Sequence, residues 1–364
     1  MRIFHIDINS TRQCNLRCKY CYEANNSLME NESYKDPENF IKFCKDFMES
    51  DFFKSNYDAI KVNFWGGEPS LNKELFNHLM DEFLEDNRVI FFMFSNGFYI
   101  DDYYINLFKM LQKIKINSEP KFVMQVSYDG EIIHDIDRVD VKGKGSSEKV
   151  RQTLQKLIDN NIYYVMKSTI SPKNFKHLYE AYLDVSKFLP QGRSYFPTID
   201  LHLSYEEGDD SYKQHGQDLY EQLIKISSYQ KQNGLDNFVF FFPNKALCAA
   251  GVSMIAVDIN GNILPCHGAL YTNYDEHLIG NVSDEDAIDK VINSSNWFKD
   301  FYTNVPEECK GCTNKFCLKC NVVKYEHSEK DKYEEKWTDH TCQPYQCYFF
   351  DIIDLVSRAH RMVS

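Results

Sequence analysis

The chain has 364 residues, of which 43% are hydrophobic and 26% charged, with a net charge of -13 and a pI near 5.4. This composition can bury one large core or two moderate ones. The negative charge argues against nucleic acid or an anionic membrane as a general partner, because both favour basic surfaces. The N-terminus has no secretory signal pattern, and no stretch approaches the roughly 20 apolar residues that span a bilayer. We therefore expect a cytoplasmic protein.

Short β-rich runs alternate with helical patterns from residue 1 to about residue 232, as in repeated βα units around a parallel sheet. Apolar residues at helical spacing mark 72–85 and 147–160 as two of the helices. Six βα units are predicted, with strands at Ile3 to Ile8, Ile60 to Trp65, Val89 to Phe94, Lys121 to Ser127, Tyr163 to Ile170 and Ile199 to Leu203.

The composition changes near Pro243, where the chain becomes rich in cysteine, glycine and asparagine. Such a segment is typical of a small domain that is stabilised by metal more than by an apolar core. We therefore predict two domains, at residues 1–235 and 236–364.

The twelve cysteines are unlike a disulfide framework, because the cytoplasm keeps thiols reduced. Clustered thiols there indicate metal ligands. One cysteine, Cys44, stands apart in a predicted helix and is expected to be a buried, inert thiol. The others form an N-terminal triad, Cys14, Cys18 and Cys21, and a C-terminal set, Cys248, Cys266, Cys309, Cys312, Cys317, Cys320, Cys342 and Cys347.

The triad follows the first predicted strand, with three and then two residues between successive thiols. Three thiolates from one loop can bind three irons of a cubane and leave the fourth iron open to a ligand. Zinc is the alternative, but it would need a fourth ligand, and the nearest candidate, His5, lies back on the strand.

The motif Cys14-x-x-x-Cys18-x-x-Cys21, with Tyr20 before the last cysteine, resembles the defining motif of the radical S-adenosylmethionine (SAM) superfamily. The resemblance implies a partial (β/α)6 barrel and a SAM-binding 4Fe-4S cluster. It also implies that motifs at the ends of the second, third and fourth strands bind SAM, at the edge where βα barrels place ligands. These residues are Gly66, Gly67, Glu68, Pro69, Ser95, Asn96, Ser127 and Asp129.

Arg138 resembles an arginine that pairs with the SAM carboxylate in related maturases, and a plain surface arginine is the alternative. For the loop that begins at Gly66, the family's role is to bind the amino end of the SAM methionine. The two glycines there would let the backbone approach a ligand closely.

The C-terminal cysteines resemble the SPASM domain, a small extension that carries two auxiliary 4Fe-4S clusters, which would bring the total to three. The central motif here has gaps of four and two residues where the family usually has five and three. Two zinc ribbons are the alternative. By motif position, Cys248, Cys266 and Cys320 would bind the inner cluster, and Cys309, Cys312, Cys317 and Cys342 the outer one. The remaining inner position is either filled by Cys347 or left as an open iron for substrate.

SPASM-bearing enzymes chiefly modify peptides and proteins. The resemblance therefore implies a maturase of a ribosomally made peptide, one that forms thioether or carbon-carbon crosslinks or inverts a stereocentre after SAM cleavage to a 5'-deoxyadenosyl radical. A formylglycine-forming anaerobic sulfatase maturase is a second possibility. A non-catalytic iron-sulfur electron carrier or zinc-binding module is a third. Expected partners are the substrate, a flavodoxin or ferredoxin as reductant and a separate leader-recognition protein.

His267 directly follows Cys266, at a position where sulfatase maturases carry an acidic base. Histidine can also accept a proton near neutral pH, so we expect His267 to be the catalytic base. A hydrogen bond that only orients the cluster is the alternative role. The change of residue type favours the peptide maturase over the sulfatase maturase.

Overall fold

The computed structural model describes residues 1–21, 32–190, 192–195, 197–199, 210–238, 249–270, 274–303 and 344–361. Its centre is a nine-stranded sheet with the order β10-β9-β7-β4-β3-β1-β11-β12-β13. Six of these strands are parallel neighbours in chain order: β1 (Ile3–Thr11), β3 (Ala59–Gly66), β4 (Val89–Ser95), β7 (Phe122–Ser127), β9 (Tyr164–Ile170) and β10 (Pro197–Ile199). The predicted α/β fold with six βα units is confirmed. The sixth strand begins earlier than predicted, at Pro197, and residues 200–209 lie outside the described residues.

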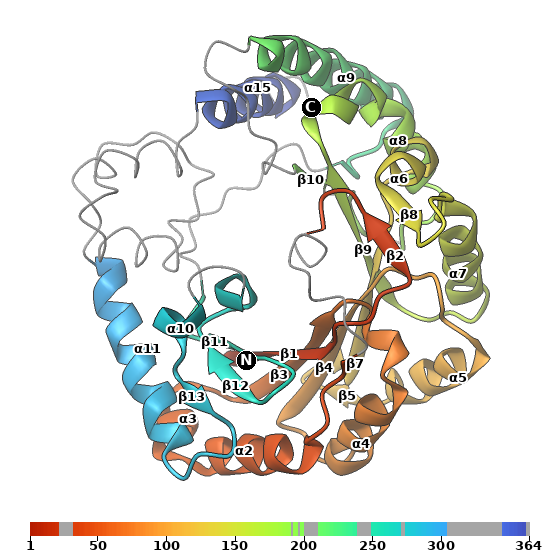
Figure 1. The fold of residues 1–364 in the computed structure, drawn as a ribbon. Helices are drawn as coiled ribbons and strands as arrows, with labels where there is room; N and C mark the ends of the chain where they lie inside the picture. Colours follow the sequence, from red (N-terminus) through yellow and green to blue (C-terminus); the bar gives the residue numbers. More distant parts are fainter. Residues whose placement is uncertain are drawn as a thin grey trace.

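Helices cover the outer face of the sheet in an arc (Figure 1). They are α2 (Pro37–Glu49), α3 (Asp51–Asn56), α4 (Lys73–Phe83), α5 (Asp102–Leu111), α6 (Glu131–Asp137), α7 (Ser147–Asp159), α8 (Leu178–Val185) and α9 (Ser211–Asn233), with 3-10 turns η1 (Pro69–Leu71) and η2 (Pro172–His177). The predicted helices at 72–85 and 147–160 correspond to α4 and α7. Cys44 is fully buried in α2, and burial raises the pKa of its thiol.

Strand β1 shows how the sheet divides its two faces. Phe4, Ile6 and Ile8 belong to the apolar core, where the ring centroids of Phe4 and of Phe47 in α2 lie 4.7 Å apart. The alternating residues His5, Asp7 and Asn9 point to the opposite, inner face, because successive side chains of a strand point to opposite sides. The inner face of the sheet is therefore partly polar, although the sheet is parallel.

The chain after residue 248 extends the same sheet. Strand β11 (Met254–Val257) pairs in parallel with β1, and β12 (Asn262–Leu264) and β13 (Gly280–Asn281) continue it in antiparallel fashion. The turn η3 (His267–Leu270) and the helices α10 (Tyr274–His277) and α11 (Ala287–Thr303) follow. The predicted boundary between residues 235 and 236 stays a prediction, and the sheet runs across it.

The last helix, α15 (Pro344–Arg361), returns to the barrel and packs against α9. Gly216 in α9 leaves room for Tyr348, since a Cβ there would collide with the tyrosine ring. Ser227 Oγ is hydrogen-bonded to His360 Nδ1 at 2.7 Å. The two ends of the predicted C-terminal domain therefore both contact the barrel.

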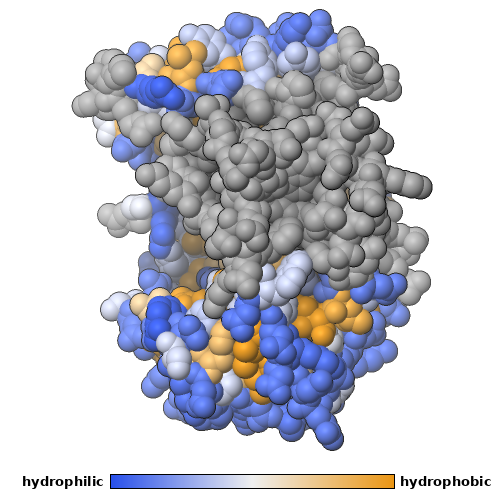
Figure 2. All heavy atoms as spheres, turned by 90° about the vertical axis from the view of Figure 1, so that its left-hand side faces the viewer, coloured by the Kyte–Doolittle hydropathy of each residue, from blue (hydrophilic) through white to orange (hydrophobic). Residues whose placement is uncertain are grey.

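The face of the molecule that carries α11 is hydrophilic over much of its described surface, with hydrophobic side chains gathered in its lower half (Figure 2). Trp297, in α11, is 43% exposed. None of the described helices is both long and apolar enough to cross a membrane.

We predict that Phe108→Ala in α5 lowers the free energy of unfolding by about 3–5 kcal/mol, because it leaves a cavity in the core. Phe108 is fully buried and stacks on Phe122, with ring centroids 4.4 Å apart. Urea unfolding followed by tryptophan fluorescence measures the loss. Met110→Ala, on the exposed face of the same helix, is the control and should change the free energy by less than about 0.5 kcal/mol. Equal midpoints for the two variants would contradict this account of the core.

Candidate active site

The cysteine triad lies on the loop after β1, which two neighbouring elements hold in place. On one side, the N–H of Gly67 donates to Thr11 O at 2.7 Å and that of Glu68 donates to Gln13 O at 2.8 Å. On the other side, β2 (Leu16–Cys18) pairs with β8 (Arg138–Asp140). The loop is thus fixed at the carboxyl edge of the sheet, as predicted for a ligand site in a βα barrel.

Gly66 and Gly67 let the backbone at the end of β3 pack closely against this loop. Gly66 has φ +122°, and a Cβ on either glycine would lie well inside 3.0 Å of backbone carbonyl oxygens of residues 11 to 13. Because those atoms are backbone, they cannot move aside as a flexible side chain would. The close approach that we expected toward a ligand is made toward the cysteine loop.

The thiols of the triad lie in a largely buried environment. Burial, with smaller contributions from charges that include those of neighbouring thiols, raises the pKa of Cys14 to about 12 and that of Cys18 to about 11. Cys14 Sγ accepts hydrogen bonds from Leu16 N at 3.4 Å and from Asn96 Nδ2 at 3.8 Å. Two of the three thiols are therefore already contacted by donors that stabilise thiolate sulfur, Cys14 by Leu16 N and Asn96 Nδ2 and Cys18 by Arg138.

The geometry of the triad differs from that of a single-ion site. In the described residues, no three His, Cys, Asp or Glu side chains converge as they would around one metal ion. His5 lies near the start of β1, about 20 Å from the carboxyl end of that strand at the usual rise per residue. Three thiolates without a fourth protein ligand are the donor set of a cubane that keeps one iron open.

Glu68 connects the cysteine loop to the end of β4. Its carboxylate is 1% exposed, and it accepts hydrogen bonds from Ser95 Oγ at 2.9 Å and Asn96 N at 2.7 Å. Burial raises the pKa of Glu68. It also caps η1, which begins at the buried Pro69. The predicted residues at the ends of the second and third strands therefore form one hydrogen-bonded group.

The predicted residues at the end of the fourth strand form a second group, centred on Asp129. Its carboxylate is fully buried and pairs with Arg138, whose Nε lies 2.5 Å from Asp129 Oδ2. Tyr20, from the cysteine loop, donates to the same carboxylate at 3.3 Å, and its ring lies 5.2 Å from the Arg138 guanidinium. Ser127, half-buried, ends β7 on the inner face.

Arg138 is not the surface arginine that was the alternative, because it is only 7% exposed. Burial alone would lower its pKa, but the Asp129 carboxylate raises that pKa well above its ordinary value. Arg138 therefore stays charged beside Cys18, where a positive charge lowers the pKa of the thiol.

His267 lies at the start of η3, next to Cys266, and reaches the inner face of the sheet. Its Nδ1 is 3.3 Å from Asp7 Oδ2, and its ring centroid is 5.4 Å from that of Trp65. Asp7 is 3% exposed, and its other oxygen accepts a hydrogen bond from Asn63 Nδ2 at 2.7 Å. The structure thus brings Asp7 together with Asn63, Trp65 and a histidine that lies 260 positions after Asp7 in the sequence.

Sequence reasoning missed Asp7, Asn63 and Trp65. The polar alternation of His5, Asp7 and Asn9 in β1 was an available signal, because a parallel strand buried on both faces is normally apolar throughout. The other predicted cluster ligands stay predictions: Cys248, Cys309, Cys312, Cys317, Cys320 and Cys342 lie outside the described residues, as does the side chain of Cys347.

Buried polar atoms at this edge fit a bound ligand. Asn9 Oδ1, Asn15 Nδ2 and Trp65 Nε1 are buried and have no hydrogen-bond partner among the described residues. Such atoms are rare in proteins, because each costs the free energy of desolvation. They lie in the cysteine loop and at the carboxyl ends of β1 and β3, where a bound ligand would give them partners.

The comparison with protein families identifies both parts of the chain. The Radical SAM superfamily model matches residues 8–182, and the SPASM model, an iron-sulfur cluster-binding domain, matches residues 248–313. The chain therefore contains a radical SAM domain, at residues 8–182, and an iron-sulfur cluster-binding SPASM domain, at residues 248–313. Its cofactors are accordingly SAM and iron-sulfur clusters, one of them the SAM-binding 4Fe-4S cluster.

Curated relatives of this radical SAM protein are distant. An uncharacterized protein of Methanocaldococcus jannaschii is 29% identical over 48% of the chain and 56% of its own length. The radical SAM cyclopropyl synthase TigE of Paramaledivibacter caminithermalis is 21% identical over 81% of the chain and 62% of its own length. A cysteine-type anaerobic sulfatase-maturating enzyme of Clostridium novyi is 22% identical over 83% of both. The chain thus spans less than two thirds of the length of each of the first two relatives.

Solved structures share the fold over nearly the whole chain. The enzyme anSMEcpe with bound AdoMet has a TM-score of 0.70 at 18% identity and covers 98% of this chain and 96% of its own. A second structure of that protein, with AdoMet and the Cp18Cys peptide, has a TM-score of 0.67. At this identity the likeness shows the fold alone.

We predict that the stability of this radical SAM protein falls by about 2 kcal/mol between pH 7.5 and pH 5 because of His134, in addition to other groups. Burial lowers the pKa of His134 to about 4. The Nδ1 atom of His134 accepts a hydrogen bond from Asp129 N at 3.4 Å. The Nε2 atom contacts Ser146 Oγ at 2.9 Å, and the Ser146 hydroxyl donates its own hydrogen to Arg138 O. Because Nδ1 acts as an acceptor, this network requires the neutral imidazole ring.

The folded state binds this proton only near pH 4, whereas the unfolded state binds it near pH 6.5. The contribution of His134 to the free energy of unfolding is therefore fully present above pH 6.5 and is lost as the pH falls from 6.5 toward 4. Urea unfolding at several pH values measures the slope, and His134→Gln, which keeps both hydrogen-bonding functions without a titrating ring, should have a shallower one. Parallel slopes for the two proteins would refute the role of His134.

Proposed function

We propose that the protein is a radical SAM maturase that abstracts hydrogen from a ribosomally made peptide and leads to a crosslink or an inverted stereocentre. The observation that carries the proposal is the group formed by the cysteine triad, Asn96 and Glu68. It includes three half-buried thiols, one amide donor and one buried carboxylate at the carboxyl edge of the sheet. When bound there, the reduced cluster supplies the electron that cleaves SAM to methionine and a 5'-deoxyadenosyl radical.

The protein's own residues would bind and orient SAM. The Glu68 carboxylate suits the amino group of the SAM methionine, because both are charged and the site is dry. Arg138 is held by Asp129 and suits the SAM carboxylate, which would share the guanidinium with Asp129. The buried surroundings exclude water, which protects reactive species from side reactions.

The auxiliary cysteines complete the proposal. We assign Cys248, Cys266 and Cys320 to an inner cluster, with Cys347 or an open iron at the remaining position, and Cys309, Cys312, Cys317 and Cys342 to an outer one. A flavodoxin or ferredoxin would supply electrons, and a separate chain could present the leader. Clusters of this kind need a reducing compartment, which supports a cytoplasmic location.

A second candidate, formylglycine formation on a sulfatase-type peptide, is favoured by the pair of His267 and Asp7. Sulfatase maturases carry an acidic base at the position where this chain has His267. In this chain, the carboxylate of Asp7 in β1 contacts that histidine. The pair could remove the proton from a substrate thiol or hydroxyl. The similarity to the C. novyi enzyme supports the same candidate.

We predict that replacing Cys14, Cys18 and Cys21 together with Ala abolishes 5'-deoxyadenosine formation. The iron content should fall from about twelve to about eight atoms per chain, because one of three four-iron clusters is lost. Anaerobic reconstitution, iron counting and a dithionite-driven assay of SAM cleavage measure both. Cys44→Ala removes a thiol buried in α2 and is the matched control that should keep both.

Unchanged SAM cleavage in the triple variant would remove the central claim. A wild-type iron content near four atoms, with stoichiometric zinc, would instead support zinc ribbons in the C-terminal segment. Absence of SAM cleavage in the wild type, with clusters present, would support an electron carrier.

We further predict that His267→Ala slows product formation about 100-fold, the usual effect of losing a general base, while SAM cleavage and iron content persist. Mass spectrometry of a cysteine-containing peptide and chromatography of 5'-deoxyadenosine measure the two yields side by side. Asp7→Asn keeps the shape of the side chain that contacts His267 but removes its negative charge, and it should slow product formation less than His267→Ala does. His78→Ala, on the outer surface in α4, is the control. Product at the wild-type rate excludes the base role, and lost iron would indicate a structural one.

A further inference from the structure

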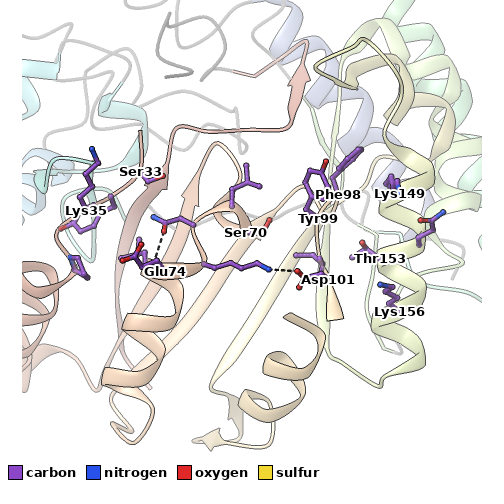
Figure 3. A pocket seen from close by; sticks show the side chains of 18 residues that line it. Ser33, Lys35, Ser70, Glu74, Phe98, Tyr99, Asp101, Lys149, Thr153 and Lys156 are labelled. Carbon is purple, nitrogen blue, oxygen red and sulfur yellow. Dashed lines mark hydrogen bonds and ion pairs between the residues drawn. The ribbon is translucent and has the colours of Figure 1, made fainter. Parts of the chain in front are cut away.

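A large cleft lies outside the cysteine loop, in a part of the protein that the proposed chemistry does not use. Its volume is about 970 Å³. Its walls come from residues 33–37, from η1 and the start of α4, from the segment after β4, and from α7 (Figure 3). This volume is at the upper end of the roughly 300–1,000 Å³ of ligand pockets, so it exceeds what a single small anion needs.

The cleft is locally basic in an acidic protein. Four lysines line it, against the carboxylates of Glu74 and Asp101. Lys73 pairs with Asp101 at 2.6 Å, and Lys156 pairs with Asp102, just outside the cleft, at 3.1 Å. Lys35 and Lys149 are exposed and form no ion pair with the described residues. In a chain of net charge -13, this concentration of positive charge favours an acidic ligand.

Two of the lysines stand at opposite ends of the cleft, and the ion pair of Lys73 with Asp101 lies between them (Figure 3). Lys35 is at one end and Lys149 at the other (Figure 3). Leu71, Phe98 and Tyr99 also line the cleft, and Phe98 and Tyr99 lie toward the Lys149 end (Figure 3). Tyr99 is 55% exposed. A lining that combines positive charge at both ends with apolar side chains suits an extended chain that carries acidic and apolar residues.

The cleft shares its walls with the active site. Ser33 Oγ donates to Thr11 Oγ1 at 2.9 Å, and Asn72 Nδ2 donates to Ser10 O at 2.8 Å, so both wall residues bind the segment that leads into the cysteine loop. On the other side, Phe98 N donates to Asn96 Oδ1 at 2.9 Å, and the amide of the same Asn96 contacts Cys14. A ligand in the cleft would therefore be held directly beside the edge at which the chemistry is proposed.

We propose that this cleft binds an acidic, extended peptide segment that belongs to the substrate and lies outside the part that reacts. This inference rests on the proposed function, because it assumes a peptide substrate. The acidic ends of the segment contact Lys35 and Lys149, and its apolar residues pack on Leu71, Phe98 and Tyr99. An acidic electron carrier could also be attracted, but protein partners of that kind dock through flat complementary surfaces, whereas a hollow with apolar side chains in its lining suits a peptide chain.

The test is the binding of two short fluorescein-labelled peptides to the anaerobically reconstituted protein, followed by fluorescence anisotropy at low salt. In one peptide, glutamates flank leucine and phenylalanine; in the other, lysines replace the glutamates. We expect the acidic peptide to bind more tightly, and Lys35→Glu with Lys149→Glu to weaken that binding about tenfold. Added salt should weaken it as well, since exposed charges are screened.

The control is Lys113→Glu with Lys225→Glu, which changes the net charge equally at exposed lysines away from the cleft and should leave binding unchanged. Dithionite-driven SAM cleavage without peptide should be equal in all three proteins, which separates a failure of this inference from a failure of the proposed function. Equal affinity for both peptides, or equal loss of binding in the control, would overturn the proposal. So would a cleft variant that binds the acidic peptide normally but loses only flavodoxin-driven cleavage, because it would assign the cleft to the electron carrier.

Discussion

The close approach of two backbone segments is the constraint on which the active site depends. Residues 11 to 13 lie so near Gly66 and Gly67 that a Cβ on either glycine would overlap backbone carbonyl oxygens. The approach permits the hydrogen bonds from Gly67 and Glu68 to the loop, and it turns the Glu68 carboxylate toward Asn96. The position of the cysteine triad, the end of β3 and the end of β4 are therefore set together, and a shift in one would move the others.

Buried charge organises the opposite side of the same loop. Asp129 and Arg138 are both withdrawn from water, and such a pair is tolerated only where the remaining hydrogen-bonding positions are filled. Tyr20 Oη and Thr169 N donate to the Asp129 carboxylate, and the neutral ring of His134 accepts from the backbone N–H of Asp129. The result is a rigid positive charge beside Cys18, held by groups from the cysteine loop, β7, β9 and α6. A site that must bind an anionic cluster and a zwitterionic cofactor benefits from that rigidity, since little reorganisation is left when they bind.

The inner face of the sheet and the outer cleft divide recognition between them. The inner face carries Asp7, Asn63 and Trp65 and meets His267, so a histidine in contact with a buried carboxylate lies there. The outer cleft has exposed lysines and apolar side chains in its lining, which suits weaker and salt-dependent contacts with a part of the substrate that does not react. Both lie against the cysteine loop, one on each side.

Features that depend on consecutive residues could be predicted from the sequence. Three such features are the alternation of strands and helices, the glycine turn at Gly66, and the spacing of Cys14, Cys18 and Cys21. Each lies within one short segment, and the position of a short segment follows from the strand it adjoins once a parallel sheet is assumed. Contacts between distant segments could not be predicted. The pairing of β11 with β1 brings His267 to Asp7 across 260 positions, and the return of α15 to α9 joins the end of the chain to the barrel. Neither contact leaves a periodic signal, because each follows from strand order and packing, which the tertiary structure alone determines.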